Sequence, residues 1–219
     1  MKNKQTIALV ILGLIVMISA VVFITMVNLE NTVSSTKSKY NESVFEIQNP
    51  DDDARTFTVE NTEIGYGNED GAWATNQLSP SYNFGLRFTN VSIPKNVTIH
   101  EAWVELYSVG TPGLDRPNCK IYCDNSSNSS EFSDSIGVLN VTGRNYTNAF
   151  SIWNETADYG VWVKTPLINT QIKEVMNNLN WSQGNPITVL FVSNGLKFYS
   201  AAFQNYESGY PAKLFIKWT

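Results

Sequence analysis

The stretch YNFGLRFTNVSIP occupies residues 82–94 and decides the expected fold. Leu86 and Phe88 alternate with Arg87, so one face of this segment is apolar and the other is polar, as in a half-buried β-strand. Pro94 lacks a backbone donor and ends the strand. The sequence therefore predicts a strand over 82–89, with Arg87 in a surface or cross-strand pairing role more readily than in contact with a ligand.

Similar runs of β-branched and aromatic residues recur throughout the chain after residue 40. We expect further strands at 40–47, 55–60, 97–107, 187–193, 196–203 and 212–218. Within 97–107, the parity of the apolar residues changes at His100–Glu101, which predicts a β-bulge. Clusters of Gly, Pro and Asn separate the runs, as turns between short strands require.

One segment has helical periodicity instead. Its apolar residues are Ile168, Ile172, Val175, Met176 and Leu179. Thr165 is expected to cap this helix, with Pro166 in its first turn and Gln171 on its polar side. Many strands and one short amphipathic helix predict a mainly β fold, a jelly-roll-like β-sandwich with the helix closing one end of the core.

The first 39 residues are of a different kind, because no charged side chain occurs between Gln5 and Leu29. A helix of about 25 residues spans a bilayer, and one that is apolar on every side must lie in lipid or inside an assembly. Lys2 and Lys4 precede the segment, which places the N-terminus in the cytoplasm and the rest of the chain outside. The residues expected to make the membrane or assembly contacts are Ile7, Leu9, Ile11, Leu14, Ile18, Val22, Phe23 and Met26.

Three interpretations of this segment are open: a cleaved secretory signal, a permanent single-span anchor, and a pilin-type helix that later packs against copies of itself. A cleaved signal usually has a shorter apolar region, whereas residues 21–24 continue the run beyond Ser19-Ala20. We favour the assembly helix. The expected domains are 1–39, a hydrophobic helix with a polar extension, and 40–219, a glycosylated β-sandwich.

A family resemblance supports this choice. The basic leader and the residues after it, KNKQTI at 2–7, followed by the apolar run, resemble archaeal type IV pilin and archaellin precursors. The resemblance implies cleavage after the leader and retention of the hydrophobic helix in the mature subunit. The family usually has Gly or Ala before the cut, and this sequence has Lys4 there.

The exterior location agrees with an excess of N-glycosylation acceptor patterns, all of them after the apolar segment. They begin at Asn41, Asn90, Asn96, Asn125, Asn128, Asn140, Asn145, Asn154 and Asn180. The chain has two cysteines, Cys119 and Cys123. An oxidising exterior favours a disulfide, but four residues of extended strand span about 13 Å, so pairing would require a loop between them. Both outcomes stay open.

A second resemblance covers most of residues 52–218. The segment GLRFTNVSIP at 85–94, followed by Ile99 and Ala102, resembles a repeated module of secreted and surface proteins. Later matches include Trp153, the pair Thr165-Pro166 and the closing PAKL at 211–214. The pattern is similar to disaggregatase-related and carbohydrate-binding-module-like jelly rolls, which implies a β-sandwich with glycan binding suspected.

The remaining residues that could bind a ligand or take part in catalysis are expected to have structural roles. Trp103, Trp153, Trp162 and Trp181 are candidate sugar-stacking platforms, but packing is the commoner role of each. The acids at 51–53 form either a calcium site or, as we favour, a solvated turn. The one histidine, His100, suits an exposed strand end, and no zinc, P-loop or nucleophile-elbow motif occurs. We therefore expect no enzymatic activity, no cofactor and no catalytic or metal site.

Charge and composition limit the classes of binding partner that we expect. Charged residues make up 16% of the 219 residues, with a net charge of −5 and no basic stripe, so nucleic acid is not an expected partner. We expect an extracellular cell-surface protein, whose partners are copies of itself in a helical homopolymer, the lipid bilayer before assembly and N-linked glycans. The expected function is that of a pilus-like filament subunit. The alternative is a membrane-anchored carbohydrate-binding or adhesion module that contacts surface polysaccharide.

Overall fold

The computed structural model describes residues 17–19, 21–23, 39–59, 62–66, 75–78, 82–109, 116–132, 141–155, 158–194 and 201–219. The chain divides into two units, Met1–Lys39 and Tyr40–Thr219. Each unit is described by itself, and the second is called the β domain.

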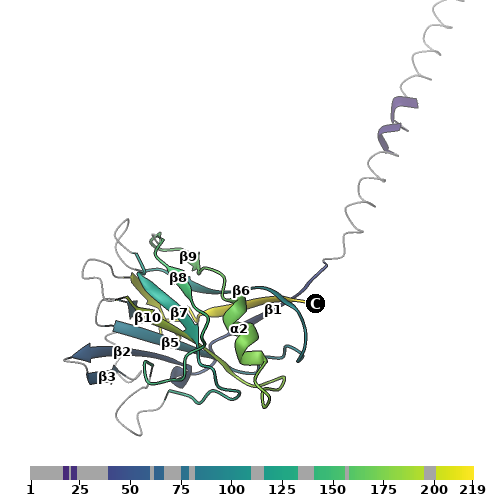
Figure 1. Ribbon diagram of the computed structural model, residues 1–219. Coiled ribbons are helices and arrows are strands. Elements are labelled where there is room, and N and C mark those ends of the chain that lie inside the picture. The colour runs from purple at the N-terminus through teal and green to yellow at the C-terminus, as the bar shows by residue number, and fades with distance from the viewer. Residues whose placement is uncertain are drawn as a thin grey trace, which may run out of the picture. The chain divides into compact units, whose positions relative to one another are not determined.

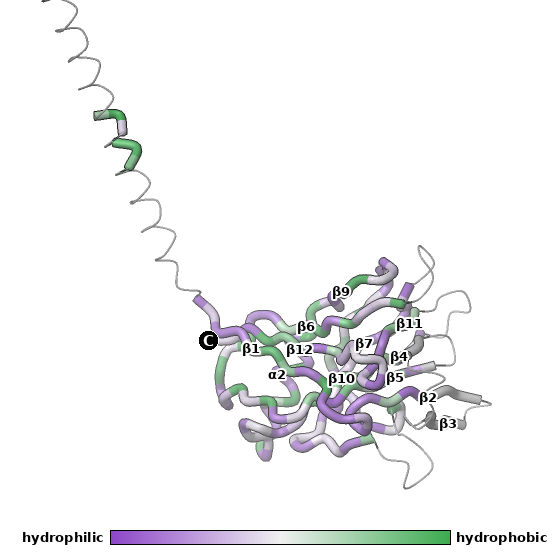
Figure 2. Tube along the Cα trace, turned by 180° about the vertical axis from the view of Figure 1, so that it is seen from behind, coloured by the Kyte–Doolittle hydropathy of each residue, from purple (hydrophilic) through white to green (hydrophobic). Residues whose placement is uncertain are grey.

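The described part of the first unit is helical, at residues 17–19 and 21–23. Met17, Ile18 and Phe23 are 73%, 59% and 70% exposed, and these fragments carry mostly hydrophobic residues (Figure 2). Among the described residues, no helix has the length and apolarity to cross a membrane. The predicted long hydrophobic helix lies mainly outside them, as do its expected contact residues Ile7, Leu9, Ile11, Leu14 and Met26 and most of the polar extension.

The β domain contains two main antiparallel sheets and a small ribbon, consistent with a β-sandwich (Figure 1). The four-stranded sheet has the order β1 (Asn41–Glu46), β12 (Lys213–Trp218), β6 (Ile99–Tyr107) and β9 (Trp162–Lys164). The six-stranded sheet has the order β3 (Thr62–Tyr66), β2 (Asp53–Val59), β5 (Tyr82–Phe88), β10 (Ile187–Ser193), β7 (Cys119–Cys123) and β8 (Ser151–Trp153). The ribbon pairs β11 (Ala201–Gln204) with β4 (Thr75–Leu78).

The strands of the four-stranded sheet define two ends of the β domain. Asn41 pairs with Trp218, and Thr98 and Thr219 exchange backbone hydrogen bonds of 2.8 and 3.0 Å. We call this the proximal end, and Figure 1 shows the C-terminus there beside β1. At the other end of β6, Tyr107 pairs with Trp162, which marks the distal end.

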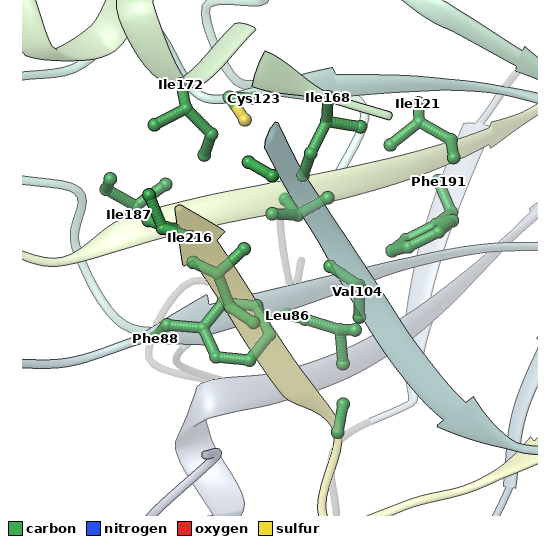
Figure 3. Packing of buried hydrophobic residues seen from close by; sticks show 14 of the residues in the cluster. Leu86, Phe88, Val104, Ile121, Cys123, Ile168, Ile172, Ile187, Phe191 and Ile216 are labelled. Carbon is green, nitrogen blue, oxygen red and sulfur yellow. The ribbon is translucent and has the colours of Figure 1, made fainter. Parts of the chain in front are cut away.

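Side chains from both sheets and from the helical segment fill the space between the sheets (Figure 3). The labelled ones that are fully buried include Leu86, Phe88, Val104, Ile121, Ile168, Ile172, Ile187, Phe191 and Ile216. Phe84 stacks on Phe191, with their ring centroids 4.2 Å apart. Each side chain of this size contributes about 1.5–3 kcal/mol when removed from water, so this core holds the two sheets together.

The predicted bulge at His100 is confirmed. Lys217 pairs with Glu101, whereas the next residue, Trp218, pairs with Ile99. His100 is therefore the extra residue of β6, and its Nε2 lies 2.9 Å from the Thr219 hydroxyl at the proximal end. Because of this insertion, Ile99 points into the core with the opposite parity to that of Ala102, Val104 and Leu106, and all four are buried.

The helix α2 (Asn169–Met176) forms, but the predictions for its cap, for Pro166 in its first turn, for its polar side and for its last apolar residue were wrong. Thr165 does not cap it: its hydroxyl accepts a hydrogen bond from Val104 N (3.0 Å) and donates one to Pro166 O (3.0 Å), and the helix starts four residues later. Gln171 is not on a polar face of the helix. It is buried, and its Nε2 donates a hydrogen bond to Ile121 O at 3.1 Å. Leu179 lies beyond the end of the helix and is 93% exposed, so it is not part of the apolar stripe.

A second, smaller apolar cluster covers part of the other face of the six-stranded sheet. It consists of Ala54, Phe132, Val141 and Leu190. Phe132 packs directly on Gly85, where a Cβ would come 2.4 Å from the Phe132 Cζ atom. The loop after β7 can therefore lie on the sheet only because residue 85 is glycine.

Two ion pairs, one buried and one partly buried, fix this loop in place. Arg87 pairs with Asp52 and donates from Nε to Ser129 O at 2.9 Å. Arg144 pairs with Asp124 at 3.1 Å, and its guanidinium lies 4.2 Å from the Phe132 ring centroid. The expected pairing role of Arg87 is thus confirmed. Removing one partner of such a pair leaves an uncompensated charge, which is strongly destabilising.

The other strand predictions agree with the structure to within a few residues. The segments 40–47, 55–60, 82–89, 97–107, 187–193 and 212–218 correspond to β1, β2, β5, β6, β10 and β12. The segment 196–203 overlaps β11 at its end, and residues 195–200 lie outside the described ones. The strands β3, β4, β7, β8 and β9 were not expected.

We predict that Leu86→Ala lowers the free energy of unfolding by about 2–5 kcal/mol, because it leaves a cavity in a fully buried site. Leu179→Ala is the matched control and should change stability by less than about 0.5 kcal/mol. Urea unfolding of the chain in mild detergent, followed by tryptophan fluorescence, measures both. Equal losses for the two variants would contradict the assignment of the core.

Candidate functional site

The outer face of the four-stranded sheet carries a group of aromatic side chains, which we call the aromatic face. Its members are Trp103, Tyr107, Trp162, Tyr210 and Phe215. The register places them together, since Phe215 pairs with Trp103 and Trp162 pairs with Tyr107. Residues that pair directly share a face of the sheet, so strand alternation sends these rings outward as it sends Val104 and Leu106 inward.

The rings of the aromatic face stack on one another. Trp103 and Phe215 lie parallel, with centroids 5.1 Å apart and planes at 2°. At the distal end, Tyr107 stacks on Tyr210 at 4.2 Å, and Trp162 meets Tyr107 edge-on at 5.6 Å. Trp162 and Tyr210 remain 38% and 40% exposed, whereas Trp103 is 6% exposed. The open part of the aromatic face is therefore its distal half.

Lysine and glutamate side chains lie beside these rings. Lys164 Nζ lies 3.6 Å from the Trp103 centroid, and Lys213 Nζ lies 4.7 Å from that of Trp162. Lys217 bridges to Glu101 at 3.0 Å, and the hydrogen bond and charge of Lys217 lower the pKa of the Glu101 carboxyl. The face thus combines flat apolar rings with polar groups of both signs at its margins.

This arrangement suits the recognition of a ring with an apolar surface and a polar edge. Exposed aromatic side chains offer flat, rigid contact area, and ammonium and carboxylate groups supply hydrogen bonds at the periphery. A pyranose ring has both features. Of the four tryptophans considered as sugar platforms, only Trp162 is open to solvent; Trp153 and Trp181 are 2% and 1% exposed, and both belong to the core.

Tyr107, Tyr210 and Phe215 were not among the residues predicted for a site. The signal was present in β6, where Glu101, Trp103, Glu105 and Tyr107 alternate with the core residues. The core residues account for one parity of this strand, and an aromatic residue at every second position of the other parity is itself unusual. Tyr210 lies in the loop before β12, where no periodicity could indicate its position.

The structure describes eight of the nine predicted glycosylation asparagines, and Asn140 lies outside the described residues. Seven of these eight are exposed: Asn41, Asn90, Asn96, Asn128, Asn145, Asn154 and Asn180. Asn125 is half-buried, because its side chain bonds Glu174 and Asn178. Exposure of the acceptor amide is what glycan attachment to a folded domain requires.

The acidic turn at 51–53 is not the solvated turn that we expected. Asp51 is exposed, but Asp52 and Asp53 are buried. Asp52 pairs with Arg87, and the Asp53 carboxylate accepts a hydrogen bond from Tyr206 N at 3.0 Å. The three carboxylates serve different partners, and among the described residues no group of three or more His, Cys, Asp or Glu side chains is arranged to hold a metal ion.

No protein-family model matches the sequence, and no curated protein matches it significantly either.

The two cysteines are free and buried in β7. Strand β7 stays extended between them and pairs with β8 and β10, so Cys119, Ile121 and Cys123 all face the core without a loop between them. The disulfide left open by the sequence does not form in this structure. Burial raises the pKa of both thiols above that of a free thiol.

We predict that iodoacetamide modifies neither cysteine of the native protein at mildly alkaline pH, because a raised pKa keeps the thiol protonated above about pH 8.5, where a free thiol would ionise. Both should react once urea exposes them. Mass spectrometry of the alkylated chain counts the modified thiols. A chain that gains no label in urea without reductant would instead be disulfide-bonded.

Proposed function

We propose that the protein is a structural subunit of an extracellular, pilus-like surface filament, with its hydrophobic helix in the core and its glycosylated β domain outside. The observation that supports this is the exposure of Met17, Ile18 and Phe23 on helical residues within an uncharged segment. Apolar side chains on a helix need cover from lipid or from other helices. Copies of the same helix supply that cover in a filament.

The β domain agrees with this proposal. Its exposed acceptor asparagines suit a surface outside the cell, where glycans keep an outer layer soluble. We propose the jelly-roll topology for it, in keeping with its facing antiparallel sheets and with α2 packed on β6 and β7. The resemblance to type IV pilins implies a helix that lies first in the membrane and then in the filament.

We predict that Ile18→Lys abolishes filament formation, because a lysine at the centre of an apolar helix costs about 2.5–3.5 kcal/mol in a membrane. Electron microscopy of the native cell surface and a count of threads per cell measure the effect.

The matched control is Ile152→Lys in β8. Ile152 is 56% exposed and Ile18 is 59% exposed, so the same change is made to side chains of similar exposure in the two units. Filaments should persist in this control. Normal filaments in the Ile18→Lys strain would overturn the proposed role of the helix.

The aromatic face supports a second candidate, a membrane-anchored carbohydrate-binding or adhesion module. Trp162 and Tyr210 present exposed rings, and the ammonium group of Lys213 lies over the ring of Trp162. Polysaccharide of the cell surface or of the surroundings is the ligand class that this chemistry fits. This function needs a single copy of the β domain and no filament.

For this candidate we predict that Trp162→Ala weakens polysaccharide binding about tenfold, equivalent to about 1.4 kcal/mol, the upper range of an aromatic contact. Phe150→Ala removes a ring of similar exposure (45%) outside the aromatic face and should leave binding unchanged. Glycan-array binding and titration calorimetry of the detergent-solubilised chain provide the measurement. Unaltered affinity in Trp162→Ala would exclude the aromatic face as the site.

A further inference from the structure

The loops at the proximal end of the β domain form one connected surface. Gly184 N donates to Val91 O at 2.9 Å, which joins the loop after α2 to the β5–β6 loop. Lys95 Nζ reinforces this junction by donating to Leu179 O at 2.8 Å. Asn185 Nδ2 donates to Ser127 O at 2.7 Å, so the loop after β7 belongs to the same surface.

Most of the predicted glycosylation sites lie on this surface. They are Asn41 at the start of β1, Asn90 and Asn96 in the β5–β6 loop, Asn125 and Asn128 after β7, Asn145, whose carbonyl bonds Asn125 N, and Asn180 after α2. Of the eight described sites, only Asn154 lies elsewhere: it follows Trp153, which pairs with Cys119 at the distal end of β7. Nothing in the sequence indicates this concentration, because the sites are spread over 140 positions.

Six of these seven asparagines project into solvent, and Asn125 does not. Asn90 and Asn96 have positive φ angles of 54° and 67°, and Asn96 lies in a turn. Asn125 is half-buried: its Nδ2 donates to Glu174 Oε1 at 3.4 Å, and its Oδ1 accepts from Asn178 Nδ2 at 2.9 Å. Glycans form their bond at Nδ2, so modification of Asn125 would place a sugar on a half-buried side chain beside Glu174.

The aromatic face carries no described site of this kind. Asn41 belongs to β1 but has the opposite strand parity to Val44, which pairs with Phe215 of the aromatic face. Tyr107 and Ile99 are the two ends of β6, so about 26 Å of strand separates the distal rings from the proximal end. Glycans of modest size at the proximal end therefore leave the distal rings uncovered.

The proximal end also presents apolar surface that a glycan would cover. Leu179 is 93% exposed and directly precedes Asn180. The edge strand β1 starts at Asn41, and a bulky group beside an edge hinders pairing with a strand of another molecule. Both features are liabilities on a bare surface and are harmless beneath a glycan.

We propose that N-linked oligosaccharides form a cover over the proximal end at Asn41, Asn90, Asn96, Asn128, Asn145 and Asn180, and that Asn125 stays unmodified. This inference rests on the extracellular location in the proposed function. In each transfer, Nδ2 of the asparagine attacks C1 of a lipid-phosphate-linked oligosaccharide. The C1–N bond forms, the C1–O bond to phosphate breaks, and one Nδ2 proton is released with the lipid phosphate.

Glycopeptide mass spectrometry of the protein from its native cells tests the pattern, with fragmentation that assigns each glycan to one asparagine. We expect glycans at the six exposed sites and none at Asn125. Comparable occupancy of Asn125 and Asn128, or occupancy confined to Asn154 and Asn140, would overturn the proposal.

A matched pair of variants tests whether Asn128 is glycosylated and Asn125 is not. Ser127→Ala removes the acceptor pattern of Asn125, and Ser130→Ala removes that of Asn128. Ser130→Ala should lower the mass of the native protein by one glycan, and Ser127→Ala should leave it unchanged. A loss of one glycan in Ser127→Ala would overturn the proposal.

Protease treatment of intact cells separates this inference from the proposed function. A β domain that is digested on intact cells yet carries no glycan would overturn the glycan cover and leave the surface location in place. A β domain that resists digestion until the cells are broken would overturn the surface location, and with it both proposals.

Discussion

The bulge at His100 sets the phase of the central strand of the four-stranded sheet, and both faces of that sheet depend on it. By inserting one residue opposite the Lys217–Trp218 step, it allows Ile99 and Val104 to face the core although their spacing breaks the alternation. The same insertion turns Trp103 and Tyr107 outward. Core packing and the aromatic face are therefore two results of a single register.

Much of the fold could be predicted because the strands follow from the periodicity of apolar residues over short segments. The alternation around Leu86 and the parity change at His100 each follow from side-chain sterics over a few residues, and both appear in the structure. The start of α2 could not be predicted in this way. Thr165 resembles a cap in sequence, but β6 offers it Val104 N as a partner, and that tertiary hydrogen bond decides where the helix begins.

The site depended on contacts that sequence does not encode locally. Tyr210 stacks on Tyr107, although the two are more than one hundred positions apart in the sequence. Asp52 was expected in a solvated turn, but it is buried in an ion pair with Arg87 of β5. The strands β8 and β9 have three residues each, which is too short for an alternation of apolar and polar residues to be recognised. The sequence shows the acceptor patterns for glycosylation, but their gathering at one end is a property of the assembled loops.

The position of β1 has a mechanical consequence. It follows the first unit directly, runs from the proximal to the distal end, and pairs with β12 along all six of its residues. If the β domain is held at its distal rings and pulled from Tyr40, tension acts along the axis of β1 and shears its hydrogen bonds to β12 together. Strands sheared in this way resist force better than strands opened one bond at a time, so the pairing of β1 with β12 would hold the β domain together against a pull on Tyr40.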